Sequence, residues 1–182
     1  MSLNWSVLTR LIIVLSLIIV NNYAKQYYIE LERSELASLD TRFLEYFNVS
    51  ARRRARRGPV VLAGGMRILY PAQNNVTLRM LLLEKHKTGY RPTPLDVKYK
   101  LCELRTKDKY FLPAIQRFSP QDLSKCPFLG VIEIKEMTFE PKMLPLKYFP
   151  YQHVRLDLTW TATATGQLLL HYSVYLKISE QP

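Results

Sequence analysis

The sequence is poor in the residues that build metal and catalytic sites. It has only two cysteines, Cys102 and Cys126, and three histidines among 182 residues. The cysteines form no CxxC pair and no Cys/His cluster, which argues against structural zinc. No HExxH or GxSxG motif is present, and we expect His153 and His171 to be solvated on the polar faces of strands. The sequence therefore predicts a protein that is not an enzyme and holds no metal and no cofactor.

Long apolar runs are also missing. The run at residues 11–20 has ten residues, whereas a membrane-spanning helix needs about 20. Because Arg10 precedes the run and Ala24 ends a cleavage site, we expect a signal peptide over residues 1–24. An uncleaved anchor is the alternative, but it would place Arg10 inside the bilayer. We expect a secreted, extracellular protein with one domain over residues 25–182 and no transmembrane segment after cleavage.

Acidic residues are the minority, with 15 Asp and Glu against 26 Lys and Arg and a formal net charge of +11. A large share of the excess lies in one cluster: Arg52, Arg53, Arg54, Arg56 and Arg57. Three interpretations stay open: a solvated turn before Gly58, a docking patch for anionic partners such as sulfated glycans or phospholipid headgroups, and a paired-basic protease site at residues 54–57. Nucleic-acid binding is not expected, because no aromatic residues interleave with the arginines.

Period-two alternation dominates the rest of the chain, and no long helical pattern is present. Residues 168–178 place six apolar side chains on one face: Leu168, Leu170, Tyr172, Val174, Leu176 and Ile178. Residues 153–160 repeat the pattern, which predicts a C-terminal hairpin. Further strands are expected at 27–32, 43–51, 60–70, 76–85, 95–104 and 131–139. About eight short strands indicate an all-β, two-sheet sandwich.

One segment follows a helical period instead. Phe111, Ile115 and Phe118 are spaced at i, i+4 and i+7, which predicts a short helix with one apolar face. In an oxidising compartment Cys102 and Cys126 most simply pair with each other, so this helix is expected inside the disulfide loop, packed over the sandwich.

Two glycosylation sequons agree with export. They are Asn48-Val49-Ser50 and Asn75-Val76-Thr77, and neither has proline in the middle. Asn48 is expected on the polar face of its strand and Asn75 in a loop, so both are candidate glycan acceptors.

Several segments carry a resemblance to a known family. They are residues 95–104 with Cys102, the predicted helix at 111–118, Cys126-Pro127-Phe128-Leu129-Gly130, residues 143–145, and residues 149–155. Together they resemble a large insect family of secreted proteins of unknown function that includes the chemosensory CheB proteins. This chain departs from the family's pattern in lacking an Asn shortly before the second cysteine and in carrying Gln152 where members have Gly.

The resemblance implies a relationship to the ML lipid-recognition fold, the immunoglobulin-like sandwich of ganglioside-activator and sterol-carrier proteins. Such a sandwich holds an apolar ligand between its sheets. We therefore name five residues as a possible pocket wall, with plain core as the alternative: Ile115, Phe118, Leu156, Leu158 and Trp160.

The function that follows is a secreted binding protein for a lipid, hydrocarbon or other small apolar molecule, with a role in chemosensory or pheromone response. The alternative is an extracellular interaction protein with a filled core, which contacts a receptor or an anionic glycan matrix through the arginines at 52–57.

Overall fold

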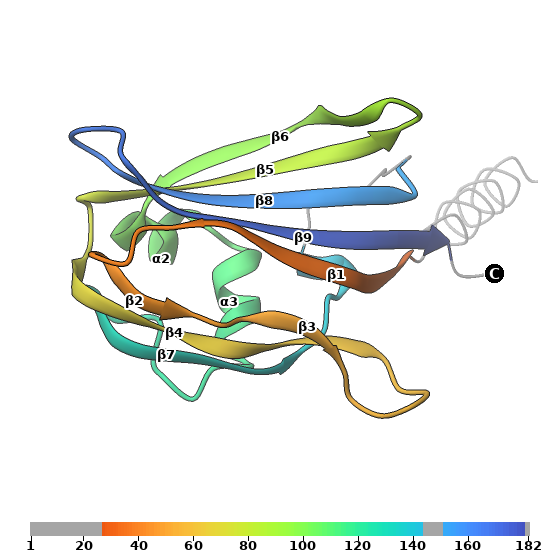
Figure 1. Cartoon of the computed structure of the whole chain (residues 1–182), viewed down its shortest axis with the longest axis horizontal. Helices are drawn as coiled ribbons and strands as arrows, with labels where there is room; N and C mark the ends of the chain where they lie inside the picture. Colours follow the sequence, from red (N-terminus) through yellow and green to blue (C-terminus); the bar gives the residue numbers. More distant parts are fainter. Residues whose placement is uncertain (1–26, 144–150, 181–182) are drawn as a thin grey trace, which may run out of the picture. The chain divides into compact units, whose positions relative to one another are not determined.

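The computed structural model describes residues 27–143 and 151–180. Tyr28–Ser179 forms one compact unit. The predicted signal peptide lies outside the described residues. Within the compact unit the strands form two layers that face each other (Figure 1). This confirms the prediction of an all-β, two-sheet sandwich.

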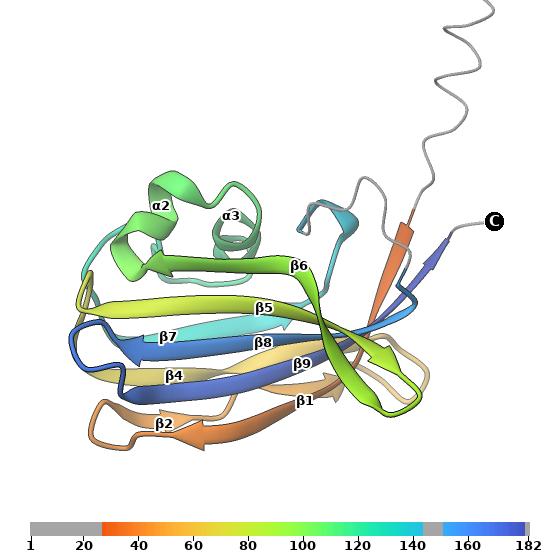
Figure 2. The same cartoon turned by 90° about the horizontal axis from the view of Figure 1, so that it is seen from above.

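The first sheet has five strands in the order β1-β9-β8-β5-β6 (Figure 2). Their bounds are Tyr27–Leu39 for β1, Val76–His86 for β5, Gly89–Lys100 for β6, His153–Ala162 for β8 and Leu168–Glu180 for β9. The predicted C-terminal hairpin is present, with Leu158 opposite Tyr172 and Trp160 opposite Leu170. Leu168, expected on the inner face, is 40% exposed because the register shifts next to the turn.

The second sheet is centred on β4 (Val60–Ala72). One side of β4 pairs with β7 (Phe128–Met137), and the other pairs in turn with β3 (Ser50–Arg53) and β2 (Leu44–Phe47). β2 pairs with the Met66–Ile68 part of β4 and β3 with the Val60–Ala63 part. The two short strands are therefore consecutive segments of a single sheet edge.

The single strand expected at residues 43–51 is divided at Asn48. The Asn48 backbone N–H donates to Gly65 O at 2.9 Å, and the Asn48 side-chain Oδ1 accepts from Gly65 N at 2.6 Å. Because a side-chain oxygen replaces a backbone partner here, the ladder is interrupted and resumes at Ser50. Gly64 lies beneath this break with a φ of +136°.

The disulfide loop carries more helix than expected. After β6 come a 3₁₀ turn η1 (Leu101–Glu103), then α2 (Leu104–Lys107) and α3 (Phe111–Gln116), and a second 3₁₀ turn η2 (Pro141–Met143) follows β7. The strand expected at 95–104 thus ends at Lys100, because Leu101 and Leu104 are buried as an i, i+3 pair on a turn. No helix in the described part of the chain is long and apolar enough to cross a membrane.

The two helices occupy one side of the sandwich. Figure 1 shows α2 and α3 in the space between the two sheets, and Figure 2 places them on the side of β6 and β7. Each sheet turns an apolar face inward, with Leu82, Leu156 and Leu176 buried in the first sheet and Ile68 and Met137 in the second. The helices therefore cover an edge of the core that the two sheets leave open.

Candidate functional site

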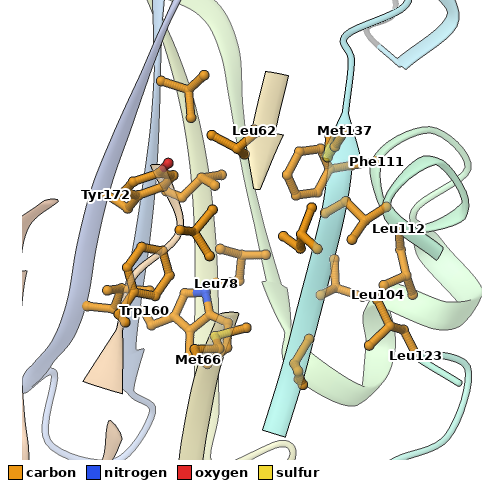
Figure 3. Close-up of a pocket in the computed structure, with 18 of the residues that line it drawn as sticks. Leu62, Met66, Leu78, Leu104, Phe111, Leu112, Leu123, Met137, Trp160 and Tyr172 are labelled. Atoms are coloured by element: carbon orange, nitrogen blue, oxygen red, sulfur yellow. The ribbon is translucent and has the colours of Figure 1, made fainter. Parts of the chain in front are cut away.

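An apolar cavity of about 120 Å³ lies between the two sheets and the helices (Figure 3). Strands β5, β8 and β9 supply one wall, β2, β4 and β7 the opposite wall, and α2 and α3 the cover between them. In Figure 3, Tyr172 and Trp160 face Met137, Phe111 and Leu112 across the space. The cavity is thus built from segments that are far apart in the sequence.

The lining is almost entirely apolar. Among the residues that the structure describes, the lining carries no charged side chain, and its polar groups are the hydroxyl of Tyr172 and the indole N–H of Trp160. The lining residues are Phe47, Val49, Leu62, Met66, Leu78, Leu101, Leu104, Phe111, Leu112, Ile115, Leu123, Phe128, Ile132, Ile134, Met137, Phe139, Leu156, Leu158, Trp160, Leu170, Tyr172 and Val174. A charged ligand group inside would lack a partner, so the cavity suits hydrocarbon.

Tyr172 is a buried residue of the lining, and its burial affects the pKa of its hydroxyl. Its ring packs against Phe47 with the ring centroids 4.8 Å apart, and the residue is 2% exposed. Burial raises the pKa of the Tyr172 hydroxyl to about 12, against a smaller lowering by the nearby Ser34. The hydroxyl therefore stays uncharged even at a pH at which an exposed tyrosine ionises.

Four of the five residues named from the sequence lie in this lining: Ile115, Leu156, Leu158 and Trp160. Phe118 does not line the cavity. It follows the end of α3 at Gln116, is half-buried, and its carbonyl accepts a hydrogen bond from the Lys135 backbone N–H at 2.7 Å. The i, i+4, i+7 spacing of apolar residues in the sequence therefore extends beyond the end of α3 at Gln116.

Sequence reasoning missed most of the other lining residues. The walls from β4 and β7, such as Met66 and Ile132, and the turn residues Leu101 and Leu104 were not named. Strand alternation marks Ile132 as inward once its strand is known, but nothing local in the sequence shows which inward residues border a void.

Polar side chains hold the helical cover in place. The Asp108 carboxylate, 7% exposed, accepts hydrogen bonds from the backbone N–H groups of Tyr110 and Phe111 at 3.1 Å and also from Leu112. These are the N–H groups that the start of α3 would otherwise leave unpaired. At the other end, Gln116 donates to Gln121 O at 2.8 Å and accepts from Leu123 N at 2.6 Å.

The predicted disulfide ties the cover to the second sheet. Cys102 in η1 is bonded to Cys126, next to the start of β7, with the Cα atoms 5.7 Å apart. Since α2 and α3 lie between these two residues, the bridge closes the loop that covers the cavity. The pairing expected from the sequence is confirmed.

The arginine cluster forms the tip of the hairpin between β3 and β4. All five side chains are exposed: Arg52, Arg53, Arg54, Arg56 and Arg57. Among the described residues only Arg54 of this group forms an ion pair, with Glu136 at 3.1 Å, and Arg53 donates to Gly58 O at 3.5 Å. We call this surface the basic hairpin.

Both sequon asparagines are exposed. Asn48 uses its Oδ1 to accept from Gly65 N, whereas Asn75 lies in the turn before β5, where its Oδ1 accepts from Gln73 N at 2.8 Å. A glycan attaches to Nδ2 of the asparagine, and in Asn75 this atom donates a hydrogen bond to Pro71 O at 3.3 Å. Both remain candidate acceptors.

A polar cluster lies on the outer face of the first sheet. Asp157 is 7% exposed and accepts from Ser173 Oγ at 2.7 Å and from Arg155 Nη2 at 2.9 Å, while His171 Nε2 lies 3.8 Å from its Oδ2. The Ser173 hydroxyl and the His171 imidazole thus both face the Asp157 carboxylate. In the catalytic triad of a hydrolase, the imidazole lies between the hydroxyl and the carboxylate. The cluster fits cross-strand pairing.

The two histidines on this face are apart. His153 is opposite Lys177 and pairs with Glu32 at 3.4 Å, while His171 is opposite Thr159. Across the described residues, no three His, Cys, Asp or Glu side chains are grouped so as to hold a metal ion.

No protein-family model and no curated protein matches the chain. The features of the molecule that bear on its function are therefore the cavity, the basic hairpin and the sequence resemblance.

Proposed function

We propose that this chain is a secreted binding protein for a small apolar molecule, held in the cavity between the two sheets. The observation that carries the proposal is the cavity itself, because closely packed protein cores contain few voids larger than a water molecule. Its apolar lining keeps water out and favours a ligand without charge.

The size of the cavity narrows the class of ligand. An engineered apolar cavity of about 150 Å³ binds benzene, so a cavity of about 120 Å³ accepts a ligand portion of similar or slightly smaller size. A longer hydrocarbon or an acyl chain requires α2 and α3 to move away from the sheets. We therefore expect small hydrocarbons to bind most readily and lipids to bind through one end of a chain.

Secretion and a chemosensory role are part of the same proposal. Secretion is supported by the Cys102–Cys126 disulfide, which is typical of oxidising compartments, and by the two exposed sequons. The chemosensory role is supported by the resemblance of segments between residues 95 and 155 to the insect family that includes the CheB proteins, and by an interior suited to hydrocarbon cues.

Binding is tested with toluene and hexane as probes, by calorimetric titration of the purified protein. Leu158→Phe, which enlarges a lining side chain, should weaken binding about tenfold without lowering the unfolding temperature. Thr159→Phe is the matched control, because the next residue of β8 points to the opposite face and should leave binding unchanged.

Two results would contradict the proposal. One is the absence of saturable binding of toluene, hexane and a panel of longer hydrocarbons and fatty acids to the wild-type protein. The other is a Leu158→Phe variant that binds the probes as tightly as the wild type, because the ligand would then lie elsewhere.

The basic hairpin favours a second candidate function, docking to an anionic glycan matrix or an acidic receptor surface. Five exposed arginines on one tip, among which only Arg54 is ion-paired in the described structure, leave positive charge free for an anionic partner. Retention on heparin should therefore fall strongly when Arg52, Arg56 and Arg57 are replaced by Ser.

The tip of the β5–β6 hairpin offers a matched control with the same change in charge. Lys85, Lys87 and Arg91 are exposed there, and replacing all three by Ser should alter heparin retention much less. Equal losses from the two triple variants would show that net charge, rather than the basic hairpin, governs retention.

A further inference from the structure

The basic hairpin has a second property that ligand binding does not explain. Its residues Arg54-Ala55-Arg56-Arg57 place arginine at the first, second and fourth positions before the Arg57–Gly58 peptide bond. Subtilisin-like endoproteases of the secretory pathway select this arrangement, since acidic subsites in their clefts pair with the basic side chains. The motif alone is weak evidence, because a protease also needs access to the backbone.

The structure places the recognition segment outside the strands. β3 ends at Arg53, which pairs with Val60, the first residue of β4. Residues 54–59 thus form the whole loop, and they correspond to the four positions before the Arg57–Gly58 bond and the two after it. The arginine side chains that a protease would read are exposed.

Little holds this loop in its folded conformation. Within it, Arg54 N donates to Pro59 O at 3.2 Å and Gly58 N to Ala55 O at 3.0 Å. From the rest of the described chain, the polar contacts to the loop are the exposed Arg54–Glu136 ion pair at 3.1 Å and the weak Arg53 bond to Gly58 O. Exposed ion pairs contribute little, so the loop can open into the extended form that a protease cleft requires.

The strand that leads into the loop is also easily released. β3 has four residues and lies at a sheet edge. Beyond its pairing with β4, the Ala51 backbone N–H is held by Ser34 Oγ at 2.8 Å. Short edge strands open locally at low cost, which extends the accessible segment on the N-terminal side of the motif.

We propose that the basic hairpin is a processing site, cut between Arg57 and Gly58 by a paired-basic endoprotease of the subtilisin class. Water is the second reactant: the peptide C–N bond breaks, Arg57 gains a carboxylate and Gly58 gains an amino group. Both cysteines lie on the C-terminal side of the cut, so no disulfide joins the two pieces.

The proposal is tested by incubating the full-length purified protein with furin. The expected product has Gly58 as its only new N-terminus, identified by mass spectrometry, and its two pieces separate on denaturing gels with or without a reductant. Arg57→Ser should abolish the cut, and Arg54→Ser should slow it by about tenfold through loss of one charge-assisted contact.

Arg52→Ser is the matched control, because it removes a neighbouring charge outside the motif and should be cut like the wild type. Trypsin serves as the control for access, since it should still cut the Arg57→Ser hairpin at the remaining arginines. The proposal is overturned if furin that is active on a reference substrate leaves the wild type intact, cuts it elsewhere, or cuts Arg54→Ser at the wild-type rate.

Discussion

Gly64 shows how tightly the two edge segments of the second sheet fit against β4. A Cβ atom at this position would lie 2.5 Å from the carbonyl oxygen of Asn48 and 2.8 Å from the Cα of Val49. Both atoms belong to the backbone, so they cannot move aside as a flexible side chain would. The positive φ of +136° adds a conformational cost for any other residue.

Gly64→Ala is therefore expected to lower the free energy of unfolding by about 2–4 kcal/mol. Gly89→Ala is the matched control, because Gly89 has a similar φ of +131° but no atom within 4 Å of the added Cβ. That control should cost only about 1 kcal/mol. Urea denaturation of both variants checks the difference, and equal losses would show that conformational strain, not the close contact, dominates.

The contribution of the Tyr172 hydroxyl to stability depends on pH. Burial raises the pKa of its hydroxyl to about 12 in the folded state, above the ordinary value of 10. The folded state therefore favours the neutral hydroxyl, and this contribution to stability is present below pH 10 and lost as the pH rises towards 12. Absorbance at 295 nm should show one tyrosine that ionises late, and this late step should be absent in Tyr172→Phe.

At the scale of elements, the α2–α3 cover is held to the sandwich at its ends. The disulfide fixes both ends, Asp108 caps the start of α3, and Gln116 ties its end to the chain before β7. Neither helix is long enough to be stable alone, so these attachments and the apolar contacts with the sheets must hold them.

Replacing Cys102 and Cys126 by Ala should lower the free energy of unfolding by about 3 kcal/mol, the value expected for closing a loop with a sequence separation of 24. The loss of stability should affect the α2–α3 cover in particular as well as the whole domain. Hydrogen exchange should become faster over residues 101–126 and stay slow in the central part of β8 and β9. Unchanged exchange in the cover would show that apolar packing alone fixes it.

At the scale of the whole molecule, the N-terminal segment connects the two layers. β1 lies beside β9 in the first sheet, whereas β2 and β3 pair with β4 in the second. Asp40 lies between them, where its carboxylate accepts from Arg42 and from Gln167 Nε2 at 2.6 Å. Hydrogen bonding to Arg42 holds the pKa of Asp40 at about 2.

Residues 25–57 and 58–182 expressed as two separate chains should therefore assemble, because Leu31 and Leu44 of the first piece are buried against strands of the second. The chain 58–182 alone should aggregate, since it exposes the apolar faces of β4 and β9. Gel filtration and circular dichroism distinguish these outcomes. A soluble, folded 58–182 chain would show that the N-terminal segment is dispensable.

The sequence by itself determined the C-terminal hairpin and the disulfide pair. Strict alternation in residues 153–160 and 168–178 specifies strands because only a period of two places their apolar side chains on one face. The two cysteines left one possible intramolecular pair. Gly58-Pro59 also marked a turn after the arginine run, and the structure places the five arginines exposed in the β3–β4 hairpin.

Tertiary structure decided the rest. The break at Asn48 depends on Gly64 and Gly65 in another strand, and the end of α3 before Phe118 depends on contacts with β7. The cavity is the clearest case. Inward apolar residues such as Leu158 and Ile115 are equally compatible with a filled core and a hollow one. Only the distance at which the helices are held from the two sheets leaves a space between them, and that distance is a property of the assembled fold.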